Sequence, residues 1–299
     1  MIKKLLNKFL IFFLTLLAYL PFPVLYLISD GLYVFVYHIF GYRIKVVRKN
    51  LIKSFPQKTN AERKEIEQKF YHHFCDLIIE TIKLIQISSY SLSKRLVIEN
   101  PEILEKFYKK QQSILFITNH YNNWEWAGTA VSATSKFKIY PIYKPLTNRY
   151  FDEFIKKIRG RFGAVPLAKN DTLRTLVANK YRLTGTAFIG DQSPVKQEIQ
   201  YWTQFLNQET PMFLGVEKIA VKFGYPVIYG HVEKLSRGYY QLTFKVLTEN
   251  PSTNKLYEIT ELHLRELESA IQKKPEFWLW SHNRWKHTKP EALETNNDG

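Results

Sequence analysis

Residues 113–126, SILFITNHYNNWEW, place a short apolar run, a polar turn and the start of a helix in direct succession. The run from Ile114 to Ile117 contains β-branched and aromatic residues, which is typical of a buried strand. The polar cluster after it holds His120, and Glu125 follows five positions later. A strand that ends in a polar turn before a helix puts such residues at the carboxyl edge of a sheet, where α/β folds keep their sites.

His120 and Glu125 are the candidate catalytic residues of this stretch. A histidine at such an edge can act as a general base, and a carboxylate on the far ring nitrogen orients the imidazole and stabilises the imidazolium. We therefore expect Glu125 to accept a hydrogen bond from His120. An isolated histidine and glutamate at this spacing more often mark an ordinary surface turn, so other features of the chain have to decide between the two interpretations.

The rest of the chain after residue 113 alternates between strand and helix patterns. Strands are predicted at 114–118, 138–143, 186–189, 226–232 and 240–247, and helices at 124–135, 149–161, 171–183, 211–223 and 255–273. Gly224 is the expected C-cap of the fourth of these helices. Such alternation predicts an α/β fold with a largely parallel sheet flanked by helices.

The region before residue 113 is expected to be helical. Residues 59–62, TNAE, have the capping-box pattern and open a predicted helix that extends to about Ile85. His72 and His73 lie in this helix, where adjacent residues face different sides, so they make a poor metal pair. Cys75 is the single cysteine, which excludes an internal disulfide and a cysteine-based metal cluster; a buried thiol is expected there.

The N-terminal residues predict a hydrophobic membrane-anchor helix or helix pair. Residues 9–28 form an uncharged stretch that is long enough for a membrane-spanning helix. Pro21 and Pro23 interrupt this stretch, so the sequence is equally compatible with a kinked or re-entrant anchor. Residues 31–41 add a second apolar piece, and lysines and arginines on both flanks would keep the body cytoplasmic. The expected organisation is an anchor at 1–41, a basic, helical part of the catalytic domain at 42–112, an α/β core at 113–288 and a polar tail at 289–299.

The composition favours an anionic partner. The chain has 299 residues and a formal net charge of +16, which attracts nucleic acid, anionic lipid headgroups or an acidic protein. Aromatic residues make up 15% of the chain, and Trp and Tyr rings are suited to headgroup depth in a membrane. Together these features favour lipid over nucleic acid.

Three further clusters stand out. Lysines and arginines crowd residues 156–161, the sequence GDQSP follows a predicted strand at 190–194, and residues 275–286, PEFWLWSHNRWK, interleave aromatic with basic residues. A tail of that kind can pack on the core, contact a membrane or stack on bases. Neither a serine-elbow motif nor a phosphate-binding glycine loop is present, which argues against a serine hydrolase or a nucleotide-driven enzyme.

These motifs, in this order, resemble those of the bacterial lipid A biosynthesis (late, or secondary) acyltransferases, which include the lauroyl and myristoyl transferases. The resemblance covers nearly the whole chain, beginning with the anchor, 42–51 (YRIKVVRKNL) and 54–56 (SFP). The family's His-x4-Asp/Glu motif appears as His120 and Glu125, with Asn123 between them. Its Tyr-Arg-Pro triplet, downstream arginine, Asp-Gln pair and Trp-x-His-x-Arg-Trp-Lys signature appear as 143–145 (YKP), Arg161, Asp191 with Gln192, and 280–286 (WSHNRWK).

The resemblance implies a membrane-bound O-acyltransferase of the inner membrane with its active site at the cytoplasmic face. It implies acyl-acyl carrier protein as donor, a lipid A precursor as acceptor, and neither a metal nor a nucleotide cofactor. Lys144 departs from the family by replacing an arginine, which keeps the charge but loses the planar fork that grips phosphate. Residues 205–207, FLN, also depart from an aromatic pair followed by glycine, so both departures bear on the acceptor.

Several alternatives remain open from sequence. The acceptor can be an aminolipid, a glycolipid or a polyene pigment precursor, and the donor can be an acyl-CoA. Arg161 and Asp191 can pair with each other, orient the catalytic loop or, for Arg161, bind an acceptor phosphate. A nucleic-acid-binding protein would leave Glu125 and the anchor without a role, and a metal-dependent hydrolase would need His72 or His73 beside His120. Acyl length, spanning or monotopic anchoring, and oligomeric state are not specified by the sequence.

Overall fold

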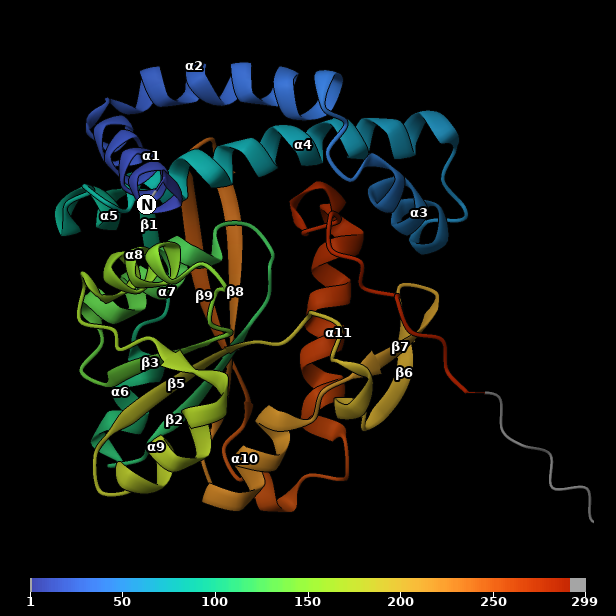
Figure 1. The fold of residues 1–299 in the computed structure, drawn as a ribbon. Helices are drawn as coiled ribbons and strands as arrows, with labels where there is room; N and C mark the ends of the chain where they lie inside the picture. Colours follow the sequence, from blue (N-terminus) through green and yellow to red (C-terminus); the bar gives the residue numbers. More distant parts are fainter. Residues whose placement is uncertain (1, 291–299) are drawn as a thin grey trace, which may run out of the picture.

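A computed structural model describes residues 2–290 and contains a seven-stranded sheet flanked by helices (Figure 1). The strand order is β1-β9-β8-β2-β5-β3-β4. The strands β8, β2, β5, β3 and β4 run parallel to one another, whereas β9 is antiparallel to β8 and β1 is parallel to β9. The prediction of a largely parallel α/β sheet is therefore confirmed.

The observed strands agree with the predicted ones, with small shifts at their ends. The sheet strands are β1 (Leu96–Ile98), β2 (Ile114–Thr118), β3 (Lys138–Tyr143), β4 (Leu167–Ala168), β5 (Thr184–Ile189), β8 (Val227–Ser236) and β9 (Tyr239–Thr248). β1 and β4 were not predicted. Because β1 pairs with β9, the region before residue 113 contributes a strand to the core sheet as well as helices.

Helices cover both faces of the sheet. In chain order they are α3 (Ile44–Ser54), α4 (Asn60–Lys83), α5 (Ser89–Arg95), α6 (Glu102–Lys109), α7 (Trp124–Thr134), α8 (Arg149–Gly160), α9 (Thr172–Ala178), α10 (Gly215–Phe223) and α11 (Glu258–Lys273). Thr59 and Glu62 form the predicted capping box, and Gly224 is the left-handed C-cap of α10. His72 is exposed and His73 buried, as their adjacent positions in α4 predict, and the Cys75 thiol is buried.

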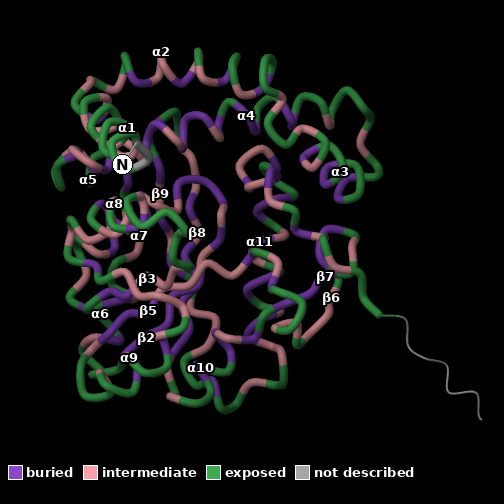
Figure 2. The backbone as a smooth tube through the Cα atoms, in the orientation of Figure 1, coloured by how far each residue is buried: buried purple, intermediate pink, exposed green. Residues whose placement is uncertain are grey.

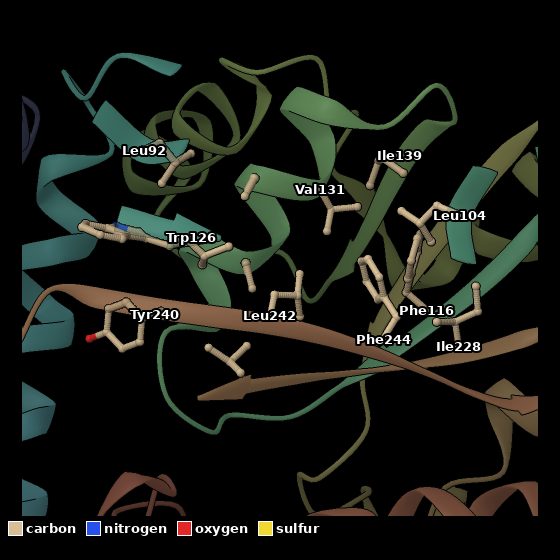
Figure 3. Close-up of a cluster of buried hydrophobic side chains, with 14 of the residues drawn as sticks. Leu92, Leu104, Phe116, Trp126, Val131, Ile139, Ile228, Tyr240, Leu242 and Phe244 are labelled. Atoms are coloured by element: carbon tan, nitrogen blue, oxygen red, sulfur yellow. The ribbon is translucent and has the colours of Figure 1, made fainter. Parts of the chain in front are cut away.

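Alternate residues of β2 point to opposite faces and define two layers of core. Ile114 and Phe116 pack in a cluster with side chains from α5, α6, α7 and α8, which Figure 3 shows around Phe244, Val131 and Trp126. Leu115 and Ile117 pack on the other face against α9, α10 and α11. The sequence run is uniformly apolar because both faces of this central strand are covered.

A β-hairpin interrupts the predicted helix at 211–223. The strands β6 (Tyr201–Phe205) and β7 (Gln208–Met212) pair antiparallel, and the turn residues Leu206 and Asn207 both have positive φ. Pro211 therefore lies in a strand, and α10 begins only at Gly215. The prediction was wrong here because a two-residue turn with left-handed backbone usually contains glycine, and this one does not.

The N-terminal apolar residues form two helices instead of one straight span. The first, α1 (Ile2–Tyr19), ends before Pro21, and α2 (Phe22–Tyr33) continues into a π-helical turn at Val34–Ile39. Of the alternatives that the sequence left open, a continuous helix over 9–28 is not observed, and the helix is interrupted at the prolines. The stretch Phe22–Ile39 is the one helical stretch among the described residues that is long and apolar enough to cross a membrane, and most of it is not buried.

The second of these helices, α2, lies along α4 over much of its length (Figure 1). Leu25, Ser29 and Tyr33 face α4 and are buried, while much of the outer side of α2 is exposed, as Figure 2 shows. The first helix, α1, contacts α8, where Asn148 donates a hydrogen bond to Asn7 at 3.2 Å. The two N-terminal helices thus contact the rest of the protein through both apolar and polar side chains, and much of their exposed surface is apolar.

The aromatic tail packs on the core. Trp278 and Trp280 are almost fully buried, and the segment after the 3-10 turn Pro275–Phe277 runs antiparallel to the His120 turn. Leu279 N donates to His120 O at 3.1 Å, and Asn122 N donates to Phe277 O at 3.0 Å. Of the three interpretations of this tail, packing is the one observed. Residues 291–299 of the predicted polar tail lie outside the described residues.

Candidate active site

The carboxyl ends of two adjacent parallel strands bring His120 and Asp191 together. β2 ends two residues before His120, and its neighbour β5 ends two residues before Asp191. The His120 Nδ1 and Asp191 Oδ1 atoms are 2.7 Å apart, and the His120 backbone N–H donates to Oδ2 at 3.0 Å. Because parallel neighbours end at the same edge, Asp191 and His120 meet at the carboxyl edge of the sheet.

Asp191 is buried yet held in its ionised form. Burial alone would raise its pKa, but the hydrogen bonds and charge of His120, together with a 2.8 Å hydrogen bond from Trp278 Nε1, lower the pKa to about 2. A buried carboxylate with donors on both oxygens is a fixed negative charge. That charge selects the tautomer of His120 with its proton on Nδ1, which leaves the Nε2 lone pair directed outward.

The outward Nε2 of His120 lies 3.2 Å from Nε2 of Gln192. Gln192 is exposed and follows Asp191 directly in the chain. The Trp124 ring packs edge-on against the imidazole, with a centroid separation of 4.9 Å. The imidazole is therefore supported on its inner side by Asp191 and is reachable from the solvent side.

Glu125 does not accept a hydrogen bond from His120, contrary to the prediction. Its carboxylate pairs with Arg159 of α8, which donates from Nε at 3.0 Å and also from Nη2. Burial lowers the pKa of Arg159, but the charge of Glu125 offsets this and leaves the pKa raised. The prediction failed because a five-residue spacing across a turn and a helix start does not fix the direction of the second side chain.

The backbone of the turn explains why asparagine stands between His120 and Glu125. Asn122 has a φ of +53°, a left-handed conformation that asparagine adopts more readily than most residues, and its Nδ2 donates to Val232 O at 2.8 Å. Asn123 then caps α7, with its Oδ1 accepting from Trp126 N at 2.9 Å. The turn therefore sends His120 toward Asp191 and Glu125 toward Arg159.

An apolar pocket opens beside these charged groups. It encloses about 830 Å³ counted to its open mouth and lies between α7 and the sheet. Trp124, Glu125 and Arg159 line it together with apolar residues such as Val131, Ile139 and Phe188. Its wall is carbon-rich and its charged groups are few, which suits a hydrocarbon chain. His120 does not line the pocket, but Trp124, which packs against the imidazole, does.

The remaining predicted site residues have different surroundings. Arg161 donates hydrogen bonds to the backbone carbonyls of Leu84 and Ile87, the second of them 3.2 Å long. It therefore stabilises the turn after α4. A pair between Arg161 and Asp191 is therefore wrong. Lys144 follows the carboxyl end of β3 and is exposed. Asn123 is buried and contacts Glu80 instead of facing solvent.

Two site residues were missed by sequence reasoning. Arg159 was noticed only as one of several basic residues, although its place on the inner side of α8 distinguishes it from the exposed Lys157. Trp278 was assigned only to an aromatic tail, and nothing local in the sequence indicated its hydrogen bond to Asp191. His282 of the same tail accepts a hydrogen bond from Ser193 N at 3.1 Å, next to Asp191 and Gln192.

Within residues 2–290, no three His, Cys, Asp or Glu side chains are arranged to hold a metal ion. The electrostatics of the site come from the pair His120 and Asp191 and from the ion pair of Glu125 with Arg159. Such an arrangement can deprotonate a hydroxyl at Nε2 while presenting a guanidinium to a carbonyl or phosphate oxygen.

A family model described as bacterial lipid A biosynthesis acyltransferase matches residues 1–287 of the chain. No curated protein sequence matches it with significant similarity. The match includes both N-terminal helices, every strand of the sheet, the two charged pairs and the aromatic tail. The family is one of membrane-associated bacterial acyltransferases, so the chain's enzymatic class is acyl transfer. The chain belongs to the bacterial lipid A biosynthesis acyltransferase family.

Proposed function

We propose that this protein transfers a fatty acyl chain from acyl-acyl carrier protein to a hydroxyl group of a lipid A precursor at the inner membrane. The observations that carry the proposal are the buried Asp191 carboxylate on His120 Nδ1 and an apolar pocket lined by Trp124, the ring that packs against the imidazole. His120 is the general base in this reaction, and neither a metal nor a cofactor takes part.

The reaction follows from the different partners of the two imidazole nitrogens. The acceptor hydroxyl displaces Gln192 from Nε2 and gives up its proton there as its oxygen attacks the thioester carbonyl carbon. Asp191 stabilises the imidazolium that forms. The tetrahedral oxyanion then collapses, the carbon–sulfur bond breaks, and His120 returns the proton to the thiolate that leaves.

Glu125 holds Arg159 in the wall of the pocket in this mechanism. Two guanidinium nitrogens of Arg159 are engaged by Glu125, and within residues 2–290 its Nη1 has no hydrogen bond. A preorganised cation next to the reacting carbonyl stabilises the oxyanion. The apolar pocket receives the acyl chain and excludes water from it, which favours transfer over hydrolysis.

The membrane and the donor fit the distribution of charge and apolar surface. Exposed apolar side chains of α1 and α2, among them Phe9, Phe12, Leu16 and Leu27, form a surface suited to lipid. The net charge of +16 favours an acidic carrier protein and anionic headgroups. Because α2 packs along α4, we expect α2 to lie at the cytoplasmic face without crossing the bilayer by itself.

The proposal is tested by mass spectrometry with the purified protein in vesicles. Acyl-acyl carrier protein and a lipid A precursor with free hydroxyacyl chains should give a product heavier by one acyl group. His120→Ala should abolish this product while the protein stays folded and membrane-bound. Aminolipid, glycolipid and polyene acceptors and an acyl-CoA donor, assayed in parallel, identify a different substrate pair. Near-wild-type turnover by His120→Ala overturns the mechanism.

A further inference from the structure

Glu80 of α4 is a fully buried carboxylate that the proposed reaction does not use. Three side chains donate hydrogen bonds to it. Tyr26 of α2 donates to Oε1 at 2.8 Å, while Tyr240 of β9 and Asn123 donate to Oε2 at 2.7 and 2.6 Å. Glu80 therefore joins a membrane-side helix, the sheet and the turn that follows His120.

The contact with Asn123 ties Glu80 to the first turn of α7. The Asn123 side chain is bound at both ends, because its Oδ1 accepts from Trp126 N and its Nδ2 donates to Glu80. Trp126 also donates from its indole nitrogen to the Glu80 backbone carbonyl at 2.9 Å. Figure 3 shows Trp126 and Tyr240 next to each other at one end of the buried cluster. One residue of α4 thus holds α7 at two points.

This turn carries groups on which the proposed site depends. Trp124 and Glu125 are the first two residues of α7, and both line the pocket. Trp124 also packs against the His120 ring. A small rotation of the turn displaces Trp124 against His120 and Glu125 against Arg159 together. Displacement of reacting groups by about 1 Å can cost roughly a hundredfold in rate.

We infer that Glu80 is a positioning residue that acts through Asn123 to hold the first turn of α7, and with it Trp124 and Glu125, in the wall of the pocket. The effect on turnover rests on the proposed function. The effect on the turn itself does not, and it is measurable in the absence of any substrate.

Two substitutions separate the hydrogen bonds from the charge. Glu80→Gln retains the geometry, because an amide oxygen at the Oε2 position accepts from Asn123 and Tyr240 and the NH2 group donates to the Tyr26 hydroxyl oxygen. Glu80→Met has nearly the same length and offers only a weakly accepting sulfur. We therefore expect Glu80→Gln to keep the wild-type kcat and Glu80→Met to lower it.

Glu67 provides a matched control on the same helix. It is also a buried carboxylate of α4 with several donors, Tyr37 at 2.7 Å and Arg48 at 2.8 Å among them. None of its hydrogen bonds or ion pairs within residues 2–290 reaches α7. A general loss of stability should affect Glu67→Met and Glu80→Met alike, whereas loss of positioning should affect only the second.

The first measurement is hydrogen exchange of the 119–130 backbone amides by mass spectrometry, on the full-length protein in vesicles. Exchange should be faster in Glu80→Met than in wild type, and unchanged in Glu80→Gln and Glu67→Met. The same exchange in Glu80→Met and Glu67→Met overturns the inference, whether or not the protein transfers acyl groups. An absence of transfer by the wild type overturns the proposed function alone.

The second measurement is a double-substitution cycle on kcat and KM. Asn123→Ser keeps an N-cap but cannot reach Glu80. We expect Glu80→Met and Asn123→Ser each to lower kcat by roughly 10- to 100-fold with little change in KM. The kcat of the double variant should be no lower than that of either single variant, because both substitutions remove the same hydrogen bond between Glu80 and Asn123. Additive losses overturn the inference. If Glu80→Met does not fold, undiminished kcat and unchanged exchange in Asn123→Ser overturn it equally.

Discussion

Replacing Asp191 by asparagine tests the core of the proposed mechanism. Asp191 Oδ2 accepts from two donors, His120 N and Trp278 Nε1, whereas among residues 2–290 the one hydrogen-bond partner of Oδ1 is His120 Nδ1. The amide oxygen of Asp191→Asn therefore takes the Oδ2 position, and its NH2 group faces Nδ1. The imidazole must then accept at Nδ1 and carry its proton on Nε2, where a base needs a lone pair.

The expected loss is large. The wrong tautomer and the missing negative charge act together, and an aspartate-to-asparagine change in a comparable histidine–aspartate arrangement costs about 10⁴-fold in kcat. The net lowering of the Asp191 pKa from its ordinary 3.8 to about 2, after burial has raised it, corresponds to about 2 kcal/mol of net stabilisation of the ionised form. A loss of roughly 10³- to 10⁴-fold in kcat is therefore expected, with KM changed little.

The assay is steady-state acyl transfer from acyl-acyl carrier protein, with circular dichroism and vesicle flotation as controls for folding and membrane binding. Asp191→Asn in a His120→Ala background should cause no further loss, since the two residues act as a unit. A kcat within about tenfold of wild type, well short of the loss expected for a wrong tautomer, would show that Asp191 does not select the tautomer.

The other predictions concern the groups around this pair. Arg159→Met should lower kcat by roughly a hundredfold at unchanged membrane binding. An unchanged kcat would show that Arg159 does not stabilise the oxyanion. Gly128 lines the pocket, and a Cβ at this position meets no atom within 4 Å. Gly128→Met should therefore shorten the pocket and favour shorter acyl donors, by up to about 0.8 kcal/mol for each methylene displaced. Competition between donors of different chain length measures this preference. Arg161→Ala should lower the free energy of unfolding by about 1–2 kcal/mol, read from urea denaturation, because two carbonyls lose their donor. Burial, aided by the charge of Asp76 and opposed by Tyr26, Tyr240 and Lys234, raises the Glu80 pKa from 4.5 to about 7. The bound proton therefore stabilises the fold fully below pH ~4.5, and this contribution, up to about 3 kcal/mol, is lost as pH rises through ~7. In Glu80→Gln the free energy of unfolding should no longer fall by this amount between pH 5 and pH 8. The same fall in Glu80→Gln and wild type would contradict this prediction.

The strands and most helices were predictable because their signals are local. The apolar run at 114–117, the alternation at 240–246 and the capping box at 59–62 each depend on residues that are neighbours in the chain. The hairpin at 201–212 was missed for the same reason, because its turn residues Leu206 and Asn207 are not the glycine-containing pair that marks such a turn.

The sequence by itself determined the α/β class, a basic protein with an apolar N-terminus, and the placement of His120 and Asp191 after strands. Only the tertiary structure decided which carboxylate orients the histidine. Asp191 reaches His120 because β2 and β5 are neighbours, a pairing of segments about 70 residues apart that no local pattern specifies. Glu125 lies nearer in sequence but is turned to Arg159, because the left-handed Asn122 and the cap at Asn123 set the direction in which α7 starts. Strand order and helix direction are set by packing of the whole core, so the tertiary structure determines which residues pair with the catalytic groups.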